Sequence, residues 1–188
     1  MKKTYSLLLT AALAFTCQSA RATTVIPPSF DQLVAQAEVI FQGSVTEVRS
    51  QWVGEGAQRH IVTYVTFKVE DAIKGTAGES YTIRMFGGTV DDESMGVSDA
   101  PEFKVGDDDI LFVENNGTQI VPLVGIMHGR FHVERDNGGQ EVVTNHDGTP
   151  VRNVARLGVT NGAAPAVERN LTAAAFKAAV RTKLQATQ

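Results

Sequence analysis

The side chains best suited to chemistry in this chain are four histidines, at positions 60, 128, 132 and 146. His128 and His132 are four residues apart in a segment that we expect to be extended, where both imidazoles could project from one face and share a metal ion. No third ligand follows in the sequence at a recognisable spacing. We therefore expect surface or half-buried strand residues here rather than a metal site.

Acidic side chains are concentrated between Gly87 and Asp109, where eight of them stand against the single Lys104. A long segment without a helix or strand pattern is usually functional or disordered. Calcium binds several carboxylate oxygens, but the spacing here matches no EF-hand. We expect a solvated acidic loop, with no metal and no cofactor.

The common nucleophile motifs are absent from the sequence: it has no Gly-x-Ser-x-Gly, His-Glu-x-x-His or Ser-x-x-Lys, and no phosphate-binding glycine loop. A catalytic triad assembled from distant residues would be invisible at this level. Such a hydrolase would need a deep pocket that places His128 or His132 beside a carboxylate and a hydroxyl. We expect binding rather than catalysis, and keep an unrecognised hydrolase as the lesser alternative.

The first 22 residues have the pattern of a secretory signal peptide. Two lysines precede an apolar run over residues 6–16, and Ala20-Arg21-Ala22 supplies the small residues of a cleavage site. We expect cleavage after Ala22 and a secreted or periplasmic product. The only cysteine, Cys17, lies in this segment, so that product would have no disulfide and would depend on core packing. A lipid anchor on Cys17 is the competing interpretation, although Thr16 is a poor match to the small residue expected before a lipidated cysteine.

The net charge narrows the choice of partner. Loss of the three basic residues of the signal peptide would change the formal charge from −4 to −7. Nucleic acid and anionic membranes need clustered Lys and Arg, so we expect neither as a partner. A basic or neutral protein, or a cation, fits better. No apolar run after Thr23 approaches the ~20 residues that cross a bilayer, so we expect no membrane span.

Patterning predicts a mainly β protein with a helix near each end. Ser29 and Gln32 form a capping box that begins a short helix over residues 30–37. A strand from Val39 changes face near Thr46, which predicts a β-bulge, and residues 61–73 alternate as its partner strand. Residues 81–85 form a third strand. A fourth, over 109–114, turns at Asn115-Asn116-Gly117 and returns over 120–123.

The rest of the chain adds one hairpin, a strap and a helix. Residues 130–134 pair with 141–144 in the hairpin, 145–169 lack periodicity and wrap the surface, and Thr172 caps the last helix. We expect a small closed or partly open antiparallel β-barrel, because closure removes exposed strand edges. The expected organisation is a signal peptide over 1–22, a barrel domain over 23–144, and the strap and helix over 145–188 packed on it.

Several loop residues are candidates for a binding surface. Trp52 lies near a hairpin end, where it could belong to the core or anchor a partner. Gly87 and Gly88 end a strand, a position that backbone geometry explains better than ligand binding. Asp91 and Asp92 begin the acidic loop. We expect these loops, together with the start of the mature chain, to contact a protein partner.

The start of the mature chain and three later segments resemble the tissue inhibitors of metalloproteinases and their netrin-like module. The matching segments are Thr23-Thr24-Val25-Ile26-Pro27-Pro28, Ala37-Glu38-Val39-Ile40-Phe41-Gln42-Gly43-Ser44-Val45, Phe67-Lys68-Val69-Glu70-Asp71-Ala72-Ile73-Lys74-Gly75, and Val105-Gly106-Asp107 leading into Ile110-Leu111-Phe112. They cover about half of the mature chain.

The resemblance implies a five-stranded barrel of the oligonucleotide/oligosaccharide-binding (OB) type. In that family the first residue chelates the zinc of the target protease and the second enters its specificity pocket, roles that would fall on Thr23 and Thr24. Thr23 and Val25 stand where the family has cysteines that tether the N-terminus. Together with the signal peptide, the resemblance implies an exported binding protein that acts as an inhibitor of a secreted metalloprotease. The alternative is an envelope structural protein, or one that binds a cation or saccharide.

Overall fold

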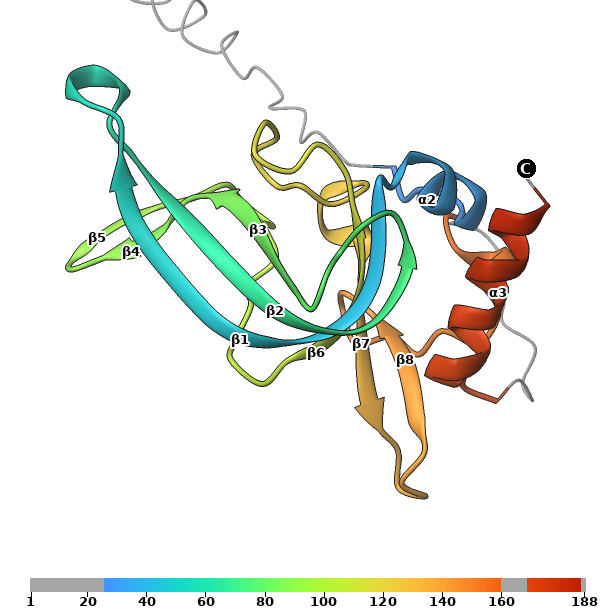
Figure 1. Cartoon of the computed structure of the whole chain (residues 1–188). Coiled ribbons are helices and arrows are strands. Elements are labelled where there is room, and N and C mark those ends of the chain that lie inside the picture. The colour runs from blue at the N-terminus through green and yellow to red at the C-terminus, as the bar shows by residue number, and fades with distance from the viewer. Residues whose placement is uncertain (1–25, 160–168, 187–188) are drawn as a thin grey trace, which may run out of the picture.

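The computed structural model describes residues 26–159 and 169–186, and a six-stranded antiparallel sheet dominates this part of the chain (Figure 1). The strand order is β3-β2-β1-β6-β7-β8, with a separate ribbon of β4 and β5. The strands are β1 (Val39–Val53), β2 (His60–Lys74), β3 (Ser80–Phe86), β4 (Gly88–Val90), β5 (Glu93–Met95), β6 (Asp108–Val113), β7 (Arg130–Arg135) and β8 (Glu141–Asn145). Two α-helices, α2 (Phe30–Gln36) and α3 (Ala173–Gln185), pack beside each other on the sheet. The predicted mainly β class with a helix near each end is confirmed for the described residues.

Helix α2 begins where the capping box predicts. Gln32 donates its backbone N–H to Ser29 Oγ at 3.3 Å, and Ser29 donates its own N–H to Gln32 Oε1 at 2.8 Å. These two bonds satisfy backbone donors that the first helical turn leaves without partners. At the other end of the chain, Thr172 accepts the Ala175 N–H in the same way and caps α3.

The long hairpin of β1 and β2 carries the predicted bulge. Its pairing register shifts between Val45 and Glu47, as well as at two points nearer the start of β1. A bulge adds a residue to one strand, which bends it and increases its twist. Both strands curve markedly along their length in Figure 1, so that one face of the hairpin turns inward.

Strand β6 is buried on both faces, which explains its unbroken apolar sequence. Ile110 and Phe112 pack into a cluster beneath α2 and α3, whereas Leu111 and Val113 pack into a second cluster on the opposite face. Alternate side chains of one strand necessarily point to opposite sides of the sheet. The fold therefore has two cores, a helix-covered core and an inner core within the curve of β1, β2 and β3.

Irregular segments cover both edges of the sheet. At β3, Phe86 donates its N–H to the Ile120 carbonyl, and Asn116 bonds the backbone of the neighbouring residues. At β8, residues 150–151 and 171–172 bridge the outer side. Covered edges cannot recruit a strand from another molecule. The strand ladder itself does not run on from β3 to β8, so the predicted closed barrel is not confirmed.

Two local predictions are corrected. The predicted return strand over 120–123 is reduced to one isolated bridge, between Val113 and Leu123, because the chain leaves β6 to bond the edge of β3. The long acidic segment, expected to lack strands, contains the β4–β5 ribbon. The strap, as far as residue 159, contains one short 3-10 helix, η3 (Val154–Arg156). Two further 3-10 helices lie elsewhere in the described chain, η1 (Gly56–Gln58) and η2 (Ile126–Gly129). The expected signal peptide lies outside the described residues.

Candidate functional site

A groove opens at the rim of the inner core, between β1 and the β4–β5 ribbon, and we call it the sheet groove. It encloses about 490 Å³ and is bounded on one side by residues 96–103. Val48, Met95 and Val97 line it and are 37%, 38% and 42% exposed. Three large apolar side chains therefore meet solvent at one place, beside buried residues of the inner core such as Val65 and Met85. Clustered apolar exposure is typical of an interaction site.

The backbone around the sheet groove is tightly held. Thr63 donates its hydroxyl to the Gly87 carbonyl at 2.6 Å and lies 2.8 Å from the Ser50 hydroxyl. A Cβ at Gly88, whose φ is +129°, would come within 2.4 Å of both hydroxyls. Only glycine lets the chain cross so close to β1 and β2. The sequence interpretation of these glycines as a backbone requirement agrees with this geometry.

The structure brings most of the predicted binding residues to this end of the molecule. Gly87 and Gly88 line the sheet groove, and Asp91 and Asp92 are exposed at the turn of the β4–β5 ribbon. Trp52 is half-buried near the end of β1, with the Arg59 guanidinium 4.0 Å from its ring centroid. Thr23 and Thr24 lie outside the described residues.

The predicted partner surface also included the start of the mature chain up to Pro28. Pro28 lies against Gly125 and Gly158, whose backbones leave no room for a Cβ beside it. In Figure 1 this region, next to α2, is remote from the β4–β5 ribbon. Pro27 and Pro28 therefore do not contribute to the sheet groove.

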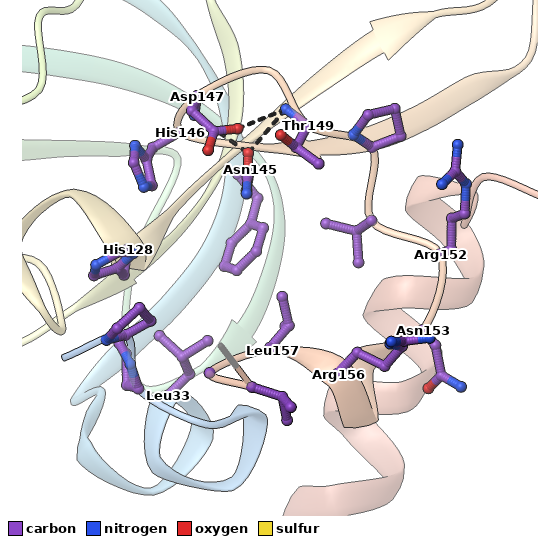
Figure 2. A pocket seen from close by; sticks show the side chains of 17 residues that line it. Leu33, His128, Asn145, His146, Asp147, Thr149, Arg152, Asn153, Arg156 and Leu157 are labelled. Atoms are coloured by element: carbon purple, nitrogen blue, oxygen red, sulfur yellow. Dashed lines mark hydrogen bonds between the residues drawn. The ribbon is translucent and has the colours of Figure 1, made fainter. Parts of the chain in front are cut away.

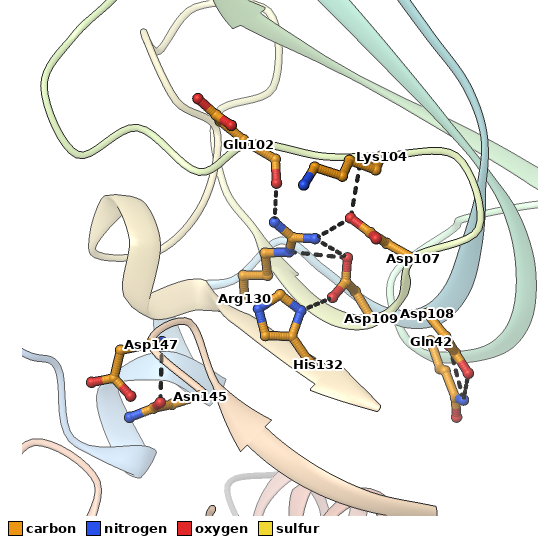
Figure 3. A network of polar contacts seen from close by, with 10 residues as sticks. All are labelled: Gln42, Glu102, Lys104, Asp107, Asp108, Asp109, Arg130, His132, Asn145 and Asp147. Carbon is orange, nitrogen blue, oxygen red and sulfur yellow. Dashed lines mark hydrogen bonds and ion pairs between the residues drawn. The ribbon is translucent and has the colours of Figure 1, made fainter. Parts of the chain in front are cut away.

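One wall of the sheet groove is fixed by a buried arginine that sequence reasoning missed (Figure 3). Arg130 donates to the Glu102 carbonyl and to Asp107 Oδ2, the latter at 2.7 Å, and its guanidinium lies 4.0 Å from the Phe103 ring centroid. It also donates from Nε to Asp109 Oδ2 at 3.0 Å. Because Arg130 is 4% exposed, these bonds form where water does not compete. They tie residues 102–107 to the sheet, and we call them the Arg130 clasp.

Asp109 also holds His132. Its Oδ1 lies 2.8 Å from His132 Nδ1, and His132 lines a cavity of about 620 Å³ on the far side of the wall. The sequence analysis required a histidine beside a carboxylate and a hydroxyl for a hydrolase. A histidine beside a carboxylate is present, as His132 and Asp109. Among the described residues, however, no hydroxyl forms a hydrogen bond with His132, and the buried Thr144 hydroxyl opposite it in the sheet has no partner.

The expectation that His128 and His132 share one face of an extended segment is wrong. His128 lies in the 3-10 helix η2 (Ile126–Gly129), ahead of β7, and its ring meets that of His146 edge-on at 4.8 Å. Figure 2 shows both rings at a cavity of about 380 Å³ beside α2. Within residues 26–159 and 169–186, no three His, Cys, Asp or Glu side chains are grouped so that they could hold a metal ion.

A second polar network joins α3 to the sheet. Lys177 donates to Gln42 Oε1 at 2.6 Å, and Gln42 donates in turn to both oxygens of Asp108 at 3.2 Å. Burial raises the pKa of Asp108 to about 6; the Gln42 hydrogen bond opposes this shift, and nearby carboxylates such as Glu70 add to it. Burial alone would also raise the pKa of Asp71, but Lys177 and Arg181 together lower it.

No family model matches the chain, and comparison with curated proteins and with solved structures found no match. In the part of the chain that the structure describes, no helix is long and apolar enough to cross a membrane. The sheet groove is therefore assigned on its own geometry.

Proposed function

We propose that this protein is an exported, non-catalytic binding protein that holds a segment of a partner protein in the sheet groove. The observation that carries the proposal is the convergence of Val48, Met95 and Val97 on one groove. Burying apolar surface is the main favourable contribution to most protein association. A partner that covers these side chains would gain this contribution without rearranging the core beneath them.

Rigidity of the groove also supports binding. The Ser50, Thr63 and Gly87 bonds anchor one side, and the Arg130 clasp fixes the other. A site that is already ordered loses little conformational entropy when it is occupied. Among the described residues no histidine lines the groove, and its Ser50 and Thr63 hydroxyls are both engaged, which favours recognition over nucleophilic chemistry.

A barrel of the OB type is part of the proposal. Segment 115–123 bonds β3 through Ile120 and bridges β6 through Leu123, so it supplies contacts where a closing strand would lie. Barrels of this type bind their ligands on an open face bordered by loops. The sheet groove, bordered by residues 96–103 and the β4–β5 ribbon, corresponds to such a face.

Metalloprotease inhibition through Thr23 and Thr24 is the more specific form of the proposal, and it rests on the family resemblance alone. An assay of zinc-protease inhibition by the mature chain, with and without one added residue before Thr23, tests it. Chelation by the free amino group predicts inhibition that the extra residue abolishes. Equal inhibition by both chains, or none, would remove this mechanism and leave the groove proposal intact.

Selection of peptides from a random display library tests the groove itself. We expect selected peptides to bind the native chain and to lose at least tenfold in affinity for Val97→Ser, which removes apolar contact from the groove. Val105→Ser is the matched control, because Val105 is 67% exposed and does not line the groove. Equal affinity for the two variants, or a library without enriched peptides, would overturn the proposal.

A further inference from the structure

Five exposed carboxylates belong to the stretch of chain that forms the ribbon and the wall of the sheet groove. The stretch from Gly87 to Phe103 contains no Lys or Arg. Its exposed acidic side chains are Asp91, Asp92, Glu93, Asp99 and Glu102. Glu102 lines the groove itself, and Asp99 lies in its wall, beside the neighbouring cavity. Asp91, Asp92 and Glu93 lie at the ribbon turn, and we call these five carboxylates the acidic rim.

The acidic rim is not neutralised within the fold. None of its five carboxylates forms an ion pair with another described residue, whereas Asp107 and Asp109 nearby are both paired with Arg130. Arg59 and Lys104 do not line the groove: Arg59 stacks on Trp52, and Lys104 lines the neighbouring cavity together with Asp99 and Glu102. Unpaired like charges around a concave apolar surface create a field that attracts cations.

The rim is also held in shape. Asp91 and Asp99 both adopt left-handed backbone conformations, with φ of +52° and +64°. This conformation is uncommon outside glycine and is tolerated best by Asp and Asn. At the far end of the wall, the Arg130 clasp bonds the Glu102 carbonyl and so leaves the Glu102 carboxylate on the outer side.

From these observations we infer that the occupant of the sheet groove is a basic segment of a partner protein, in which apolar side chains alternate with lysine or arginine. The inference rests on the proposed function and adds the chemical class of the partner. In an extended chain, successive side chains point to opposite sides. Apolar residues would then cover Val48 and Val97, while the basic residues between them reach the acidic rim.

Three labelled peptides of equal length test this, each compared by fluorescence anisotropy at low and moderate salt. One alternates lysine with valine, the second alternates glutamate with valine, and the third alternates lysine with serine. We expect the lysine–valine peptide to bind at least tenfold more tightly than either of the others. Its affinity should fall as salt screens the rim, because surface charges interact over a Debye length of about 10 Å at 0.1 M salt.

A pair of variants links the effect to the rim. Asp91→Asn with Asp99→Asn removes two rim charges and keeps side chains that tolerate the left-handed backbone. Glu79→Gln with Glu134→Gln removes the same charge from exposed positions outside the groove. We expect the first pair to weaken binding of the lysine–valine peptide about fivefold to tenfold, and the second pair to leave it within twofold.

The outcomes separate the two proposals. Equal binding of the lysine–valine and glutamate–valine peptides, sensitive to Val97→Ser, would overturn the basic partner and retain the groove. Equal losses in the two pairs of charge variants would likewise overturn it, since the effect would then follow net charge alone. If Val97→Ser leaves the affinity for the lysine–valine peptide unchanged, the groove proposal is overturned as well.

Discussion

The two faces of the sheet at β1 and β6 are covered to different extents. On one face, α2 and α3 cover the helix-covered core, and Phe176 contacts Phe112 and Phe131 with ring centroids 6.2 and 4.9 Å apart. On the other face, the inner core is enclosed by the curve of the sheet but ends at the sheet groove, where Val48 and Val97 meet solvent.

Under the proposed function, this difference separates a side of the molecule that serves stability from a side that serves recognition. A third helix or a longer loop could have covered the groove, as α2 and α3 cover the opposite face. Instead, partly buried hydrogen bonds fix the groove, and exposed carboxylates lie on the ribbon and the wall that form it. Substitutions on the covered face should therefore change the free energy of unfolding, and those in the groove should change binding.

Phe176→Ala should give the largest loss of stability. Phe176 is fully buried and contacts three other aromatic rings, so its removal leaves a cavity beneath α3. We expect the free energy of unfolding to fall by about 4 kcal/mol. Urea denaturation followed by circular dichroism measures it. A loss below about 1 kcal/mol would show that the helices are not the main support of this face.

Arg130→Met should come next and should affect both regions. It leaves the Asp109 carboxylate buried without its cation, which costs about 3 kcal/mol, and it releases the groove wall. We expect a lower unfolding free energy and weaker peptide binding in the same protein. Arg130→Lys, which keeps the charge, should recover part of the stability. Unchanged binding by Arg130→Met at a temperature where it is folded would contradict the positioning role of the clasp.

Asp108→Asn should stabilise the protein at neutral pH. The folded-state pKa of Asp108 is raised from 3.8 to about 6, so its favourable contribution is complete below pH 3.8 and is lost as the pH rises through 6. Asparagine removes that loss and can still accept from Gln42. After allowance for its partial exposure, we expect a gain of roughly 1–2 kcal/mol at pH 7 that disappears near pH 4. The free energy of unfolding of both proteins, measured from pH 4 to pH 7, tests this expectation. A difference between them that does not vary with pH would contradict the raised pKa of Asp108.

Arg181→Ala should have the smallest effect. Arg181 is 45% exposed on its side chain and pairs with Asp71, whose pKa it helps to lower. Such surface pairs contribute about 0.5 kcal/mol, present above the ordinary pKa of Asp71 and lost as the pH falls through its lowered value. Thermal melts over a descending pH series should therefore differ from those of the native chain at pH 7, and the difference should disappear as Asp71 becomes protonated. A loss above about 2 kcal/mol would contradict the assignment of this contact as an exposed ion pair.

Local patterns in the sequence predicted most of the elements. The capping box at Ser29, the bulge near Thr46 and the hairpin of β7 and β8 depend on residues close in the chain, and all three are confirmed. The return strand over 120–123 failed because its partner is β3, a contact between distant segments that no local pattern records.

Only some residues of the candidate site could be predicted from the sequence. Gly87 and Asp91 stood out by residue type, and the structure places both at the sheet groove or its rim. Val48 and Val97 did not, because a valine in a strand or loop gives no sign of whether it is covered. Arg130 was missed for a related reason: its partners Glu102, Asp107 and Asp109 are more than twenty residues away. The run of three aspartates after Gly106 was the available signal.

Methionine methyl resonances provide the most direct measurement of the central claim. Of the four methionines, Met85 and Met95 line the sheet groove, and Met127 lies at the cavity beside His132. Titration of the methyl-labelled protein with the lysine–valine peptide should shift the Met85 and Met95 signals and leave that of Met127 in place. A shift confined to Met127, or saturable binding that moves neither groove methionine, would contradict the assignment of the groove as the binding site.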